Sequence, residues 1–288
     1  MFLSEPKVLS TPRGTFTWRE GGDPKGVPVV MIHGWPESSY CWEHTGRHIK
    51  AGLRVIAPDL RGLGDSERTE GLHHYRKQAL AKDVISMLDE LGITKFQLVG
   101  HDWGGIVAQE VALAIPERVQ KMVLMNIAVI NNLKGNMEVI AKVRSGSSKA
   151  YWYQHFQQAP GLAEAMIPGN EAVWIGYFVN GVMGEIPKDA VAEYVRMYSI
   201  AGTPSTGANY YRAFGEDAKR WATLSGHRWA MPSLYIYGNK DEVIIPEYLN
   251  HIEDCFDDIR VEQVDAGHFL HEEKPEEVAG HLNQFLDN

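Results

Sequence analysis

The stretch Gly100-His101-Asp102-Trp103-Gly104 decides the fold, because it joins an apolar run to a helical pattern. The run Phe96-Gln97-Leu98-Val99 is typical of a buried strand, and residues 105–112 are typical of a helix. The glycines would let the backbone take a strained turn that exposes the central side chain above the sheet. A carboxylate at that place attacks carbon and leaves an ester on the enzyme, whereas a serine would serve esterases and peptidases. The pattern therefore predicts an aspartate nucleophile, and the simpler alternative is an Asp that N-caps the helix.

Length and composition exclude several classes of protein. The chain has 288 residues, of which 44% are hydrophobic, and this fits one large α/β domain or a core with an inserted subdomain. Its formal charge of -9 argues against nucleic acid or an anionic membrane surface as a partner. Cys41 and Cys255 form no spaced motif, which favours two structural thiols in a reducing compartment. Without a signal peptide or a membrane-spanning run, we expect a cytoplasmic protein that is a monomer or a homodimer.

Strand-like and helix-like segments alternate along most of the chain, which predicts a mostly parallel sheet with helices on both faces. Residues 15–19 alternate polar and apolar side chains and are expected to form an antiparallel edge strand. The alternation stops at residues 131–221, which are helix-like and rich in aromatic side chains. We therefore predict an α/β core of residues 1–130 and 222–288, with 131–221 as a helical cap over the catalytic face. Buried strands are expected at 27–32, 54–57 and 96–99, and strands at 121–127, 233–237 and 260–264 are expected to complete the parallel set.

Two candidate partners of the nucleophile follow predicted strands. Catalytic groups in open α/β sheets gather outside the carboxyl ends of the strands. His268 ends the loop Asp265-Ala266-Gly267-His268 and is expected to act as a general base. Asp241 follows the strand at 233–237 and is expected to orient the imidazole and to stabilise its charged form, with Glu242 as a weaker candidate. His271 stands at the Glu-rich start of the last helix and is interpreted as structural.

The loop His33-Gly34-Trp35-Pro36 follows the first buried strand and is expected to complete the site. We predict that the backbone amides of Trp35 and Trp103 donate to the oxyanion that forms during the reaction. We also expect His33, Pro36 and the Trp103 side chain to contact the substrate. The alternative is an ordinary Gly-Pro turn, which explains these residue types but not their place at the end of the strand.

Together these residues resemble the epoxide-hydrolase branch of the α/β-hydrolase superfamily. The order Asp102, Asp241, His268 is the nucleophile, acid and histidine order of that superfamily. The resemblance implies the α/β-hydrolase fold, a small-molecule epoxide substrate and a reaction without metal or cofactor. The matching segments are His33-Gly34-Trp35-Pro36-Glu37-Ser38, Arg61-Gly62-Leu63-Gly64-Asp65-Ser66, Gly100-His101-Asp102-Trp103-Gly104-Gly105 and Asp265-Ala266-Gly267-His268.

The resemblance extends into the predicted cap, where soluble epoxide hydrolases carry two tyrosines whose hydroxyls hold and protonate the epoxide oxygen. Residues 153–161 resemble the segment with the first tyrosine, which implies Tyr153. The aromatic cluster Tyr151-Trp152-Tyr153 permits a slip in register there. The segment Asn209-Tyr210-Tyr211-Arg212 resembles the other, with Tyr211 in the catalytic place. The implied product is a vicinal diol.

Haloalkane and haloacetate dehalogenases share the aspartate nucleophile and are the alternative enzymes. Haloalkane dehalogenases commonly have Asn at the loop position that holds Trp35 here. Haloacetate dehalogenases typically place Arg directly after the nucleophile, where this chain has Trp103. A non-catalytic ligand receptor of the same fold is the alternative from another class, but such receptors usually keep a serine at the turn.

Overall fold

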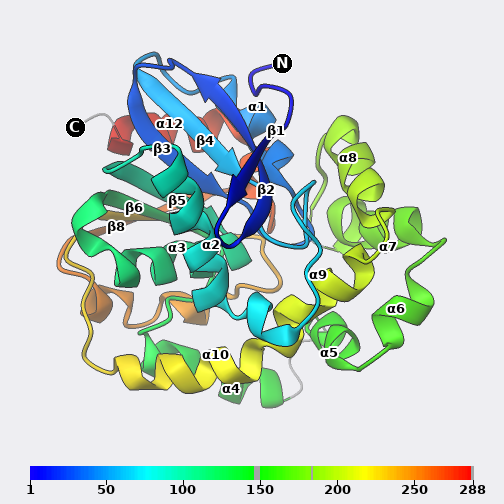
Figure 1. Cartoon of the computed structure of the whole chain (residues 1–288). Helices are drawn as coiled ribbons and strands as arrows, with labels where there is room; N and C mark the ends of the chain where they lie inside the picture. The colour runs from blue at the N-terminus through cyan, green and yellow to red at the C-terminus, as the bar shows by residue number, and fades with distance from the viewer. Residues whose placement is uncertain (146–149, 183, 287–288) are drawn as a thin grey trace.

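The centre of the molecule is an eight-stranded sheet with strand order β1-β2-β4-β3-β5-β6-β7-β8 (Figure 1). The computed structural model describes residues 1–145, 150–182 and 184–286. β1 and β2 pair antiparallel, β2 and β4 also pair antiparallel, and all later neighbours are parallel, which confirms the predicted fold class. The strands are β1 (Lys7–Thr11), β2 (Gly14–Gly22), β3 (Val27–Ile32), β4 (Leu53–Pro58), β5 (Phe96–His101), β6 (Val119–Met125), β7 (Ser233–Gly238) and β8 (Ile259–Val264).

The edge of the sheet differs from the expectation. We expected the edge strand at residues 15–19, but these belong to β2, and β1 lies outside it. Val8 is 70% exposed, and β1 has no buried residue, so its side chains show no clear apolar face that a pattern could detect. The turn between Thr11 and Gly14 brings β1 back against β2. β6 also ends earlier than expected, because Asn126 has a φ of 41° and turns the chain out of the sheet.

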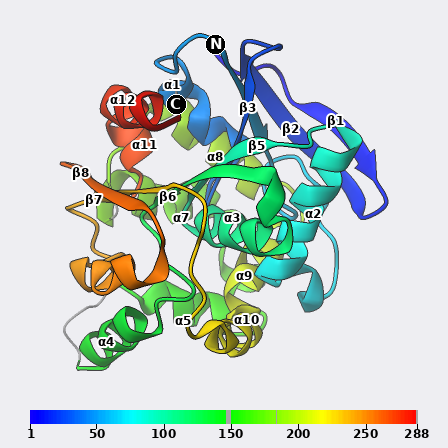
Figure 2. The ribbon, with the colours of Figure 1, turned by 90° about the vertical axis from the view of Figure 1, so that its left-hand side faces the viewer.

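Helices cover both faces of the sheet, as Figure 2 shows. One face carries α2 (Lys77–Glu90) and α3 (Trp103–Ala114), which pack on each other. The other face carries α1 (Trp42–Gly46), α11 (Leu270–Glu273) and α12 (Pro275–Leu286). Short 3₁₀ turns join several elements: η1 (Ser39–Cys41), η2 (Leu72–Tyr75), η3 (Pro116–Arg118), η6 (Pro246–Leu249) and η7 (Ile252–Cys255).

The chain between β6 and β7 is helical, and none of its described residues from 126 to 228 lies in a strand. Figure 1 shows these helices, green to yellow, to the right of the sheet and below it. In none of the described ranges does a helix have the length and apolar character needed to cross a membrane. The helices are α4 (Leu133–Arg144), α5 (Trp152–Gln158), α6 (Leu162–Met166), α7 (Glu171–Tyr177), the π-helical η4 (Phe178–Val182), α8 (Lys188–Tyr198), α9 (Thr203–Arg212), α10 (Phe214–Trp221) and the 3₁₀ turn η5 (Ala222–Leu224).

The pairing register brings the predicted site segments to one edge of the sheet. Ile32 of β3 is opposite Gly100 of β5, and Gly238 of β7 is opposite Val264 of β8. Because these strands are parallel, the loops that follow them leave the sheet at the same end.

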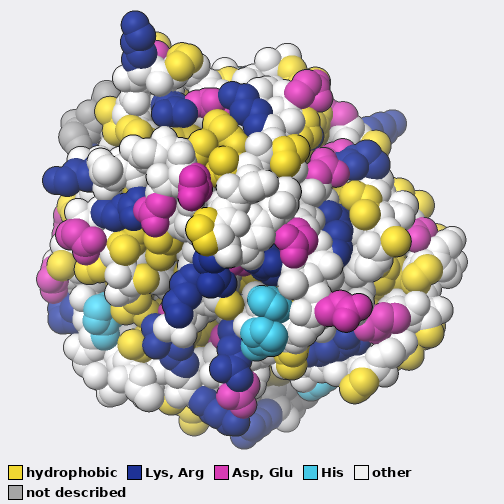
Figure 3. All heavy atoms as spheres, viewed as in Figure 1, with side chains coloured by type: hydrophobic (Ala, Val, Ile, Leu, Met, Phe, Trp, Pro, Cys, Tyr) yellow, Lys and Arg dark blue, Asp and Glu magenta, His cyan; other side chains and the backbone are white. Residues whose placement is uncertain are grey.

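On the surface in Figure 3, positively and negatively charged side chains are interspersed. Cys41 and Cys255 are both buried free thiols.

Candidate active site

Asp102 occupies the N-cap position of α3, with φ 48° and ψ -130°. A non-glycine residue in such a conformation costs on the order of 1–3 kcal/mol, so the surrounding structure must hold it there. Its side chain makes no capping hydrogen bond within the described part of the chain. Instead Oδ1 accepts the Trp35 N–H at 2.8 Å. The carboxylate is thus turned away from its own helix and toward the loop after β3.

The glycines around the turn are needed because the two loops approach each other closely. They are not needed for a positive φ, since Asp102 itself adopts that conformation. A Cβ atom on Gly104 would lie 2.3 Å from the carbonyl oxygen of His33. A Cβ atom on Gly34 would lie 2.4 Å from the Cβ of Asp102. Real side chains do not fit at these distances, so glycine is required wherever the two loops touch.

His268 lies between two carboxylates. Its Nδ1 is 2.7 Å from Oδ2 of Asp241, and its Nε2 is 3.5 Å from Oδ2 of Asp102. The N–H groups of Val243 and Ile244 donate to Oδ1 of Asp241 at 2.7 and 3.1 Å, which fixes that carboxylate. The structure therefore brings the three residues that the sequence singled out into one buried acid–histidine–acid row.

Electrostatics favour the charged form of His268. Burial by itself lowers the pKa of the imidazole, because it penalises the cation. The carboxylates of Asp241 and Asp102 outweigh burial and raise the pKa of His268 well above its ordinary value. The protonation state of His268 thus depends on whether Asp102 carries its charge.

Tyr153 of α5 and Tyr211 of α9 meet above the nucleophile. Their ring centroids are 5.7 Å apart, and the Tyr153 ring stacks on Trp35 at 5.5 Å. The Tyr211 ring meets Trp103 edge-on at 5.4 Å. Burial and the Asp102 carboxylate raise the pKa of Tyr153, and burial raises that of Tyr211. Both phenols therefore stay protonated at neutral pH and can donate.

A small cavity of about 90 Å³ lies between these groups. Tyr151, the other tyrosine of the cluster, is absent from the described residues that line it and donates to the carbonyl of Val243. The lining is mostly apolar: Asp102, Trp103, Ile106, Ile127, Ala128, Tyr153, Gln154, Tyr211, Phe214, Trp221, Val243, Ile244 and Tyr248. A larger apolar cavity of about 390 Å³ between α4 and α10 adjoins it, since both are lined by Ala128, Phe214, Trp221 and Tyr248.

The structure does not bring His33 and Pro36 to this cavity, because neither is among the described residues that line it. His33 is fully buried, with Nε2 accepting the Leu60 N–H at 3.0 Å and Nδ1 2.8 Å from the carbonyl oxygen of Gly34. Burial lowers the pKa of His33, which favours the neutral ring that this bonding needs. Pro36 follows a cis peptide bond to Trp35.

Sequence reasoning missed a buried network behind the nucleophile. Oε2 of Glu37 accepts the Gly34 N–H at 3.0 Å and lies 2.9 Å from Nδ1 of His101. Nε2 of His101 is in turn 2.9 Å from the carbonyl oxygen of His268. Nε2 of His271 lies 3.0 Å from the other oxygen of Glu37, and burial lowers the pKa of His271 to about 4. Glu37 and His101 stand inside the quoted motifs, but nothing in the motifs shows that they connect the two loops.

Asn126 is a second missed residue. Its Nδ2 donates to the carbonyl oxygens of Gly267 and His268, both at 3.0 Å. Its Oδ1 accepts the N–H of Gly238 at 2.8 Å. Asn126 therefore ties the loop of the candidate base to the end of β7, and the only signal in the sequence is a polar residue near the end of the predicted strand 121–127.

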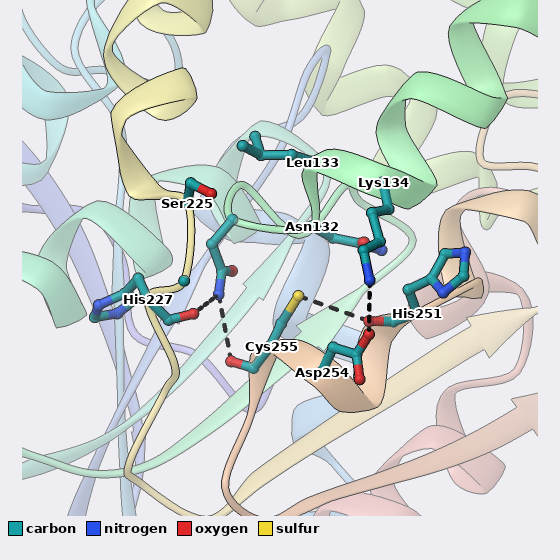
Figure 4. Close-up of a pocket in the computed structure, with 10 residues that line it drawn as sticks. Asn132, Leu133, Lys134, Ser225, His227, His251, Asp254 and Cys255 are labelled. Carbon is teal, nitrogen blue, oxygen red and sulfur yellow. Dashed lines mark hydrogen bonds and ion pairs between the residues drawn. The ribbon is translucent and has the colours of Figure 1, made fainter.

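A further surface pocket of about 450 Å³ contains none of the candidate catalytic residues (Figure 4). It lies where α4 begins, beside the segment that carries His251 and Asp254. Nζ of Lys134 is 3.6 Å from a carboxylate oxygen of Asp254, and both side chains are largely exposed. The thiol of Cys255 lines this pocket, and burial raises its pKa to about 11, which keeps it protonated.

Comparison with known proteins identifies the class. The alpha/beta hydrolase fold family model matches residues 27–275, and the chain belongs to that family. Epoxide hydrolase A of Mycobacterium tuberculosis is 28% identical, over 93% of this chain and 92% of the relative. Epoxide hydrolase 3 of Siraitia grosvenorii is 29% identical, over 91% and 92%. The crystal structure of epoxide hydrolase A from Mycobacterium thermoresistibile superimposes with a TM-score of 0.87 at 25% identity, covering 99% of this chain and 98% of that one. The expected resemblance to epoxide hydrolases is thereby confirmed.

Proposed function

We propose that this protein is an epoxide hydrolase that converts an epoxide into a vicinal diol through an ester on Asp102. One observation carries the proposal: a carboxylate held by the Trp35 amide, with Nε2 of His268 3.5 Å away, faces two protonated tyrosines across a small apolar cavity. The relatives named epoxide hydrolases support the same activity. The apolar cavity between α4 and α10 favours an epoxide with an apolar substituent.

Ring opening is the first step. Because Oδ1 of Asp102 is bound by the Trp35 amide, Oδ2 is the oxygen that attacks a ring carbon. The carbon–oxygen bond of the ring breaks as the ester bond forms, and the departing oxygen takes a proton from Tyr153 or Tyr211. An alkoxide is a basic leaving group, so it needs an acid such as a phenol.

Ester hydrolysis is the second step. His268 removes a proton from water, and the resulting hydroxide attacks the ester carbonyl carbon of Asp102. The oxyanion takes the place of Oδ1, where the Trp35 amide already points. The Trp103 amide is the first N–H of α3 and has no acceptor within the helix, so it is the second donor. The ester bond then breaks, and the departing oxygen of the diol takes the proton from His268. The proton left on the Asp102 carboxyl group, which came with the water, returns to the tyrosine that gave its own proton in ring opening, so the carboxylate and the phenol are both restored.

The charge of Asp102 couples the two steps through the pKa of His268. While Asp102 is ionised, both carboxylates raise that pKa. Once Asp102 is an uncharged ester, only Asp241 still raises it, so His268 loses its proton more readily and can act as the base.

We expect the rate of ester hydrolysis to rise with pH through the pKa of His268, because only the neutral imidazole accepts a proton. Asp241→Asn removes the largest contribution that raises this pKa, so the rise should move to lower pH. The maximal rate should also fall by roughly 10²-fold or more, because the imidazole is no longer oriented. Single-turnover kinetics between pH 5 and 9 measure both effects. The exposed Asp265→Asn is the control, and an unshifted profile in Asp241→Asn would contradict the assignment.

The cap tyrosines give the test of the function itself. Tyr153→Phe and Tyr211→Phe each remove one hydroxyl and keep the ring, so packing should change little. The double variant should open epoxides roughly 10²-fold or more slowly, the usual scale of general acid catalysis. The panel is styrene oxide, an aliphatic epoxide, 1-bromobutane and fluoroacetate, with Tyr177→Phe on the exposed side of α7 as the control.

The panel also separates this function from a dehalogenase. Trp103 lines the cavity, and its buried indole N–H has no hydrogen-bond partner among the described residues, so it is the candidate donor to a halide. A halide leaves as a stable anion and needs no phenol, so any dehalogenation should survive loss of both tyrosine hydroxyls. If the double variant opens epoxides at the wild-type rate, or if the wild type consumes only the halogenated compounds, the proposal is wrong.

A further inference from the structure

Lys77, the first residue of α2, is a buried cation that contacts α10 and α9, the helix that carries Tyr211. Its Nζ lies 3.1 Å from Oδ2 of Asp217 in α10 and donates to the carbonyl oxygen of Tyr210 in α9. The same ammonium stands 4.0 Å from the centre of the Trp103 ring. Oδ1 of Asp217 also accepts the backbone N–H of Lys77 at 3.1 Å. Asp217 therefore caps α2 from another part of the chain.

The placement of a full ion pair here needs an explanation. Neither side chain is more than 2% exposed, and burial lowers the pKa of Lys77 while it raises that of Asp217. Both shifts reflect the cost of removing charge from water, and apolar side chains often fill such a place at equal or better stability. The reaction described above uses neither group directly.

The contacts of Lys77 converge on one catalytic side chain. Its bond to the carbonyl of Tyr210 fixes the peptide that leads into Tyr211. Its cation lies over the Trp103 ring, which Tyr211 meets edge-on at 5.4 Å. Tyr211 is therefore held through its backbone on one side and through its ring on the other, and Lys77 supports both.

Other bonds also hold α9 to the core, but they are made by side chains of α9 rather than by its backbone. Oγ1 of Thr206 donates to the carbonyl of Gly62 at 2.7 Å, and the hydroxyl of Tyr210 donates to the carbonyl of Arg61 at 2.8 Å. These contacts set where α9 lies. The bond from Lys77 acts on the last turn, at the residue before Tyr211.

We propose that Lys77, paired with Asp217, is a positioning residue for ring opening, which sets the hydroxyl of Tyr211 over Asp102. The proposal rests on the proposed function. It concerns only the first step, because ester hydrolysis uses His268 and the backbone amides of Trp35 and Trp103.

The test is Lys77→Met, measured by rapid mixing with styrene oxide. Ester formation should slow by roughly 10- to 100-fold, the scale of a misplaced catalytic group, while hydrolysis of the ester should stay within about twofold. In a Tyr211→Phe background the same change should cost almost nothing, because the hydroxyl that Lys77 positions is already gone. An equal loss in both steps, or an undiminished loss in the Tyr211→Phe background, overturns the proposal.

A matched control is available on α10, the helix that also carries Asp217. Arg220 of α10 forms an ion pair with the buried Glu110 of α3 at 3.0 Å, so it also joins α10 to the core. It contacts neither Tyr210 nor Trp103 in any recorded interaction of the described residues. Arg220→Met should lower thermal stability without slowing ester formation relative to hydrolysis. If it slows ring opening as much as Lys77→Met does, the effect comes from loosening the packing of α10 on the core, and the proposal fails.

Two further variants separate positioning from folding. Lys77→Met combined with Asp217→Leu replaces the ion pair with apolar groups and should restore much of the lost thermal stability. Ring opening should stay slow, because the carbonyl of Tyr210 still lacks its donor. Recovery of ring opening together with stability would contradict the proposal.

If Lys77→Met does not fold, Asp217→Asn should slow the same step, and its failure to do so counts against the pair. A wild-type protein that opens no epoxide refutes the proposed function and this role with it, whereas an active wild type leaves the variants to decide on Lys77 alone.

Discussion

Asp102→Ala should reduce epoxide turnover by roughly 10⁴-fold or more, because removing a covalent nucleophile abolishes the intermediate rather than weakening a contact. The other carboxylate in the row, Asp241, is bound through Oδ2 by His268 and through Oδ1 by two backbone N–H groups. It is also absent from the described residues that line the cavity. Among the described residues, no second carboxylate lines the cavity and could replace the nucleophile. Diol formation from styrene oxide, followed by chromatography, measures the loss.

The control for this variant lies in the loop of the candidate base. Asp265 is largely exposed and pairs with Lys240 at 2.8 Å, so Asp265→Ala should keep full activity. Circular dichroism and thermal unfolding should show that Asp102→Ala keeps the fold, because the substitution removes one side chain at the cavity and leaves the sheet and the apolar core intact. Turnover above roughly 1% of the wild-type rate would mean that another group is the nucleophile, since such a small loss is typical of an assisting residue.

His268→Gln should stop the reaction after its first step and trap the ester. Ring opening needs Asp102 and a tyrosine, and both remain in place. Hydrolysis needs a base, and glutamine cannot accept the proton. The protein should therefore gain the mass of one epoxide within the first turnover and keep it. Intact-mass spectrometry after addition of substrate detects this adduct directly.

Two controls make the mass measurement decisive. The exposed His73→Gln should turn over normally and show no lasting adduct. His268→Gln combined with Asp102→Ala should show no adduct at all, which assigns the added mass to the carboxylate. If His268→Gln loses activity but never gains mass, the two-step scheme is wrong.

Much of the fold and the row of Asp102, His268 and Asp241 could be predicted from sequence because each depends on local signals. Buried parallel strands need near-continuous apolar runs, and β3 matches its expected bounds. Asp102 directly follows the buried β5, and Asp241 and His268 lie a few residues after β7 and β8, so finding the strands also locates these residues. β1 could not be predicted, because half-exposed edge strands carry little apolar pattern.

The supporting residues of the site were harder to predict because their roles depend on contacts between distant segments. Lys77 and Asp217 are 140 positions apart, and each alone suggests a solvated surface charge. His33 was expected to touch substrate from its place in a motif, but its ring nitrogens are engaged with the backbone at Leu60 and Gly34. Motif position predicts that a residue matters near the site, but the direction of its side chain is decided by packing.

The partnership of Lys77 and Asp217 has a consequence for recombination between relatives. The predicted cap, residues 131–221, is the segment to exchange when a chimera is built, since both joints lie outside the sheet. A donor segment without an acidic residue at position 217 would leave Lys77 as an unpaired cation in the interior and the first turn of α2 without its acceptor. Donor segments must therefore be chosen together with residue 77, so that a buried charge is never left without its partner.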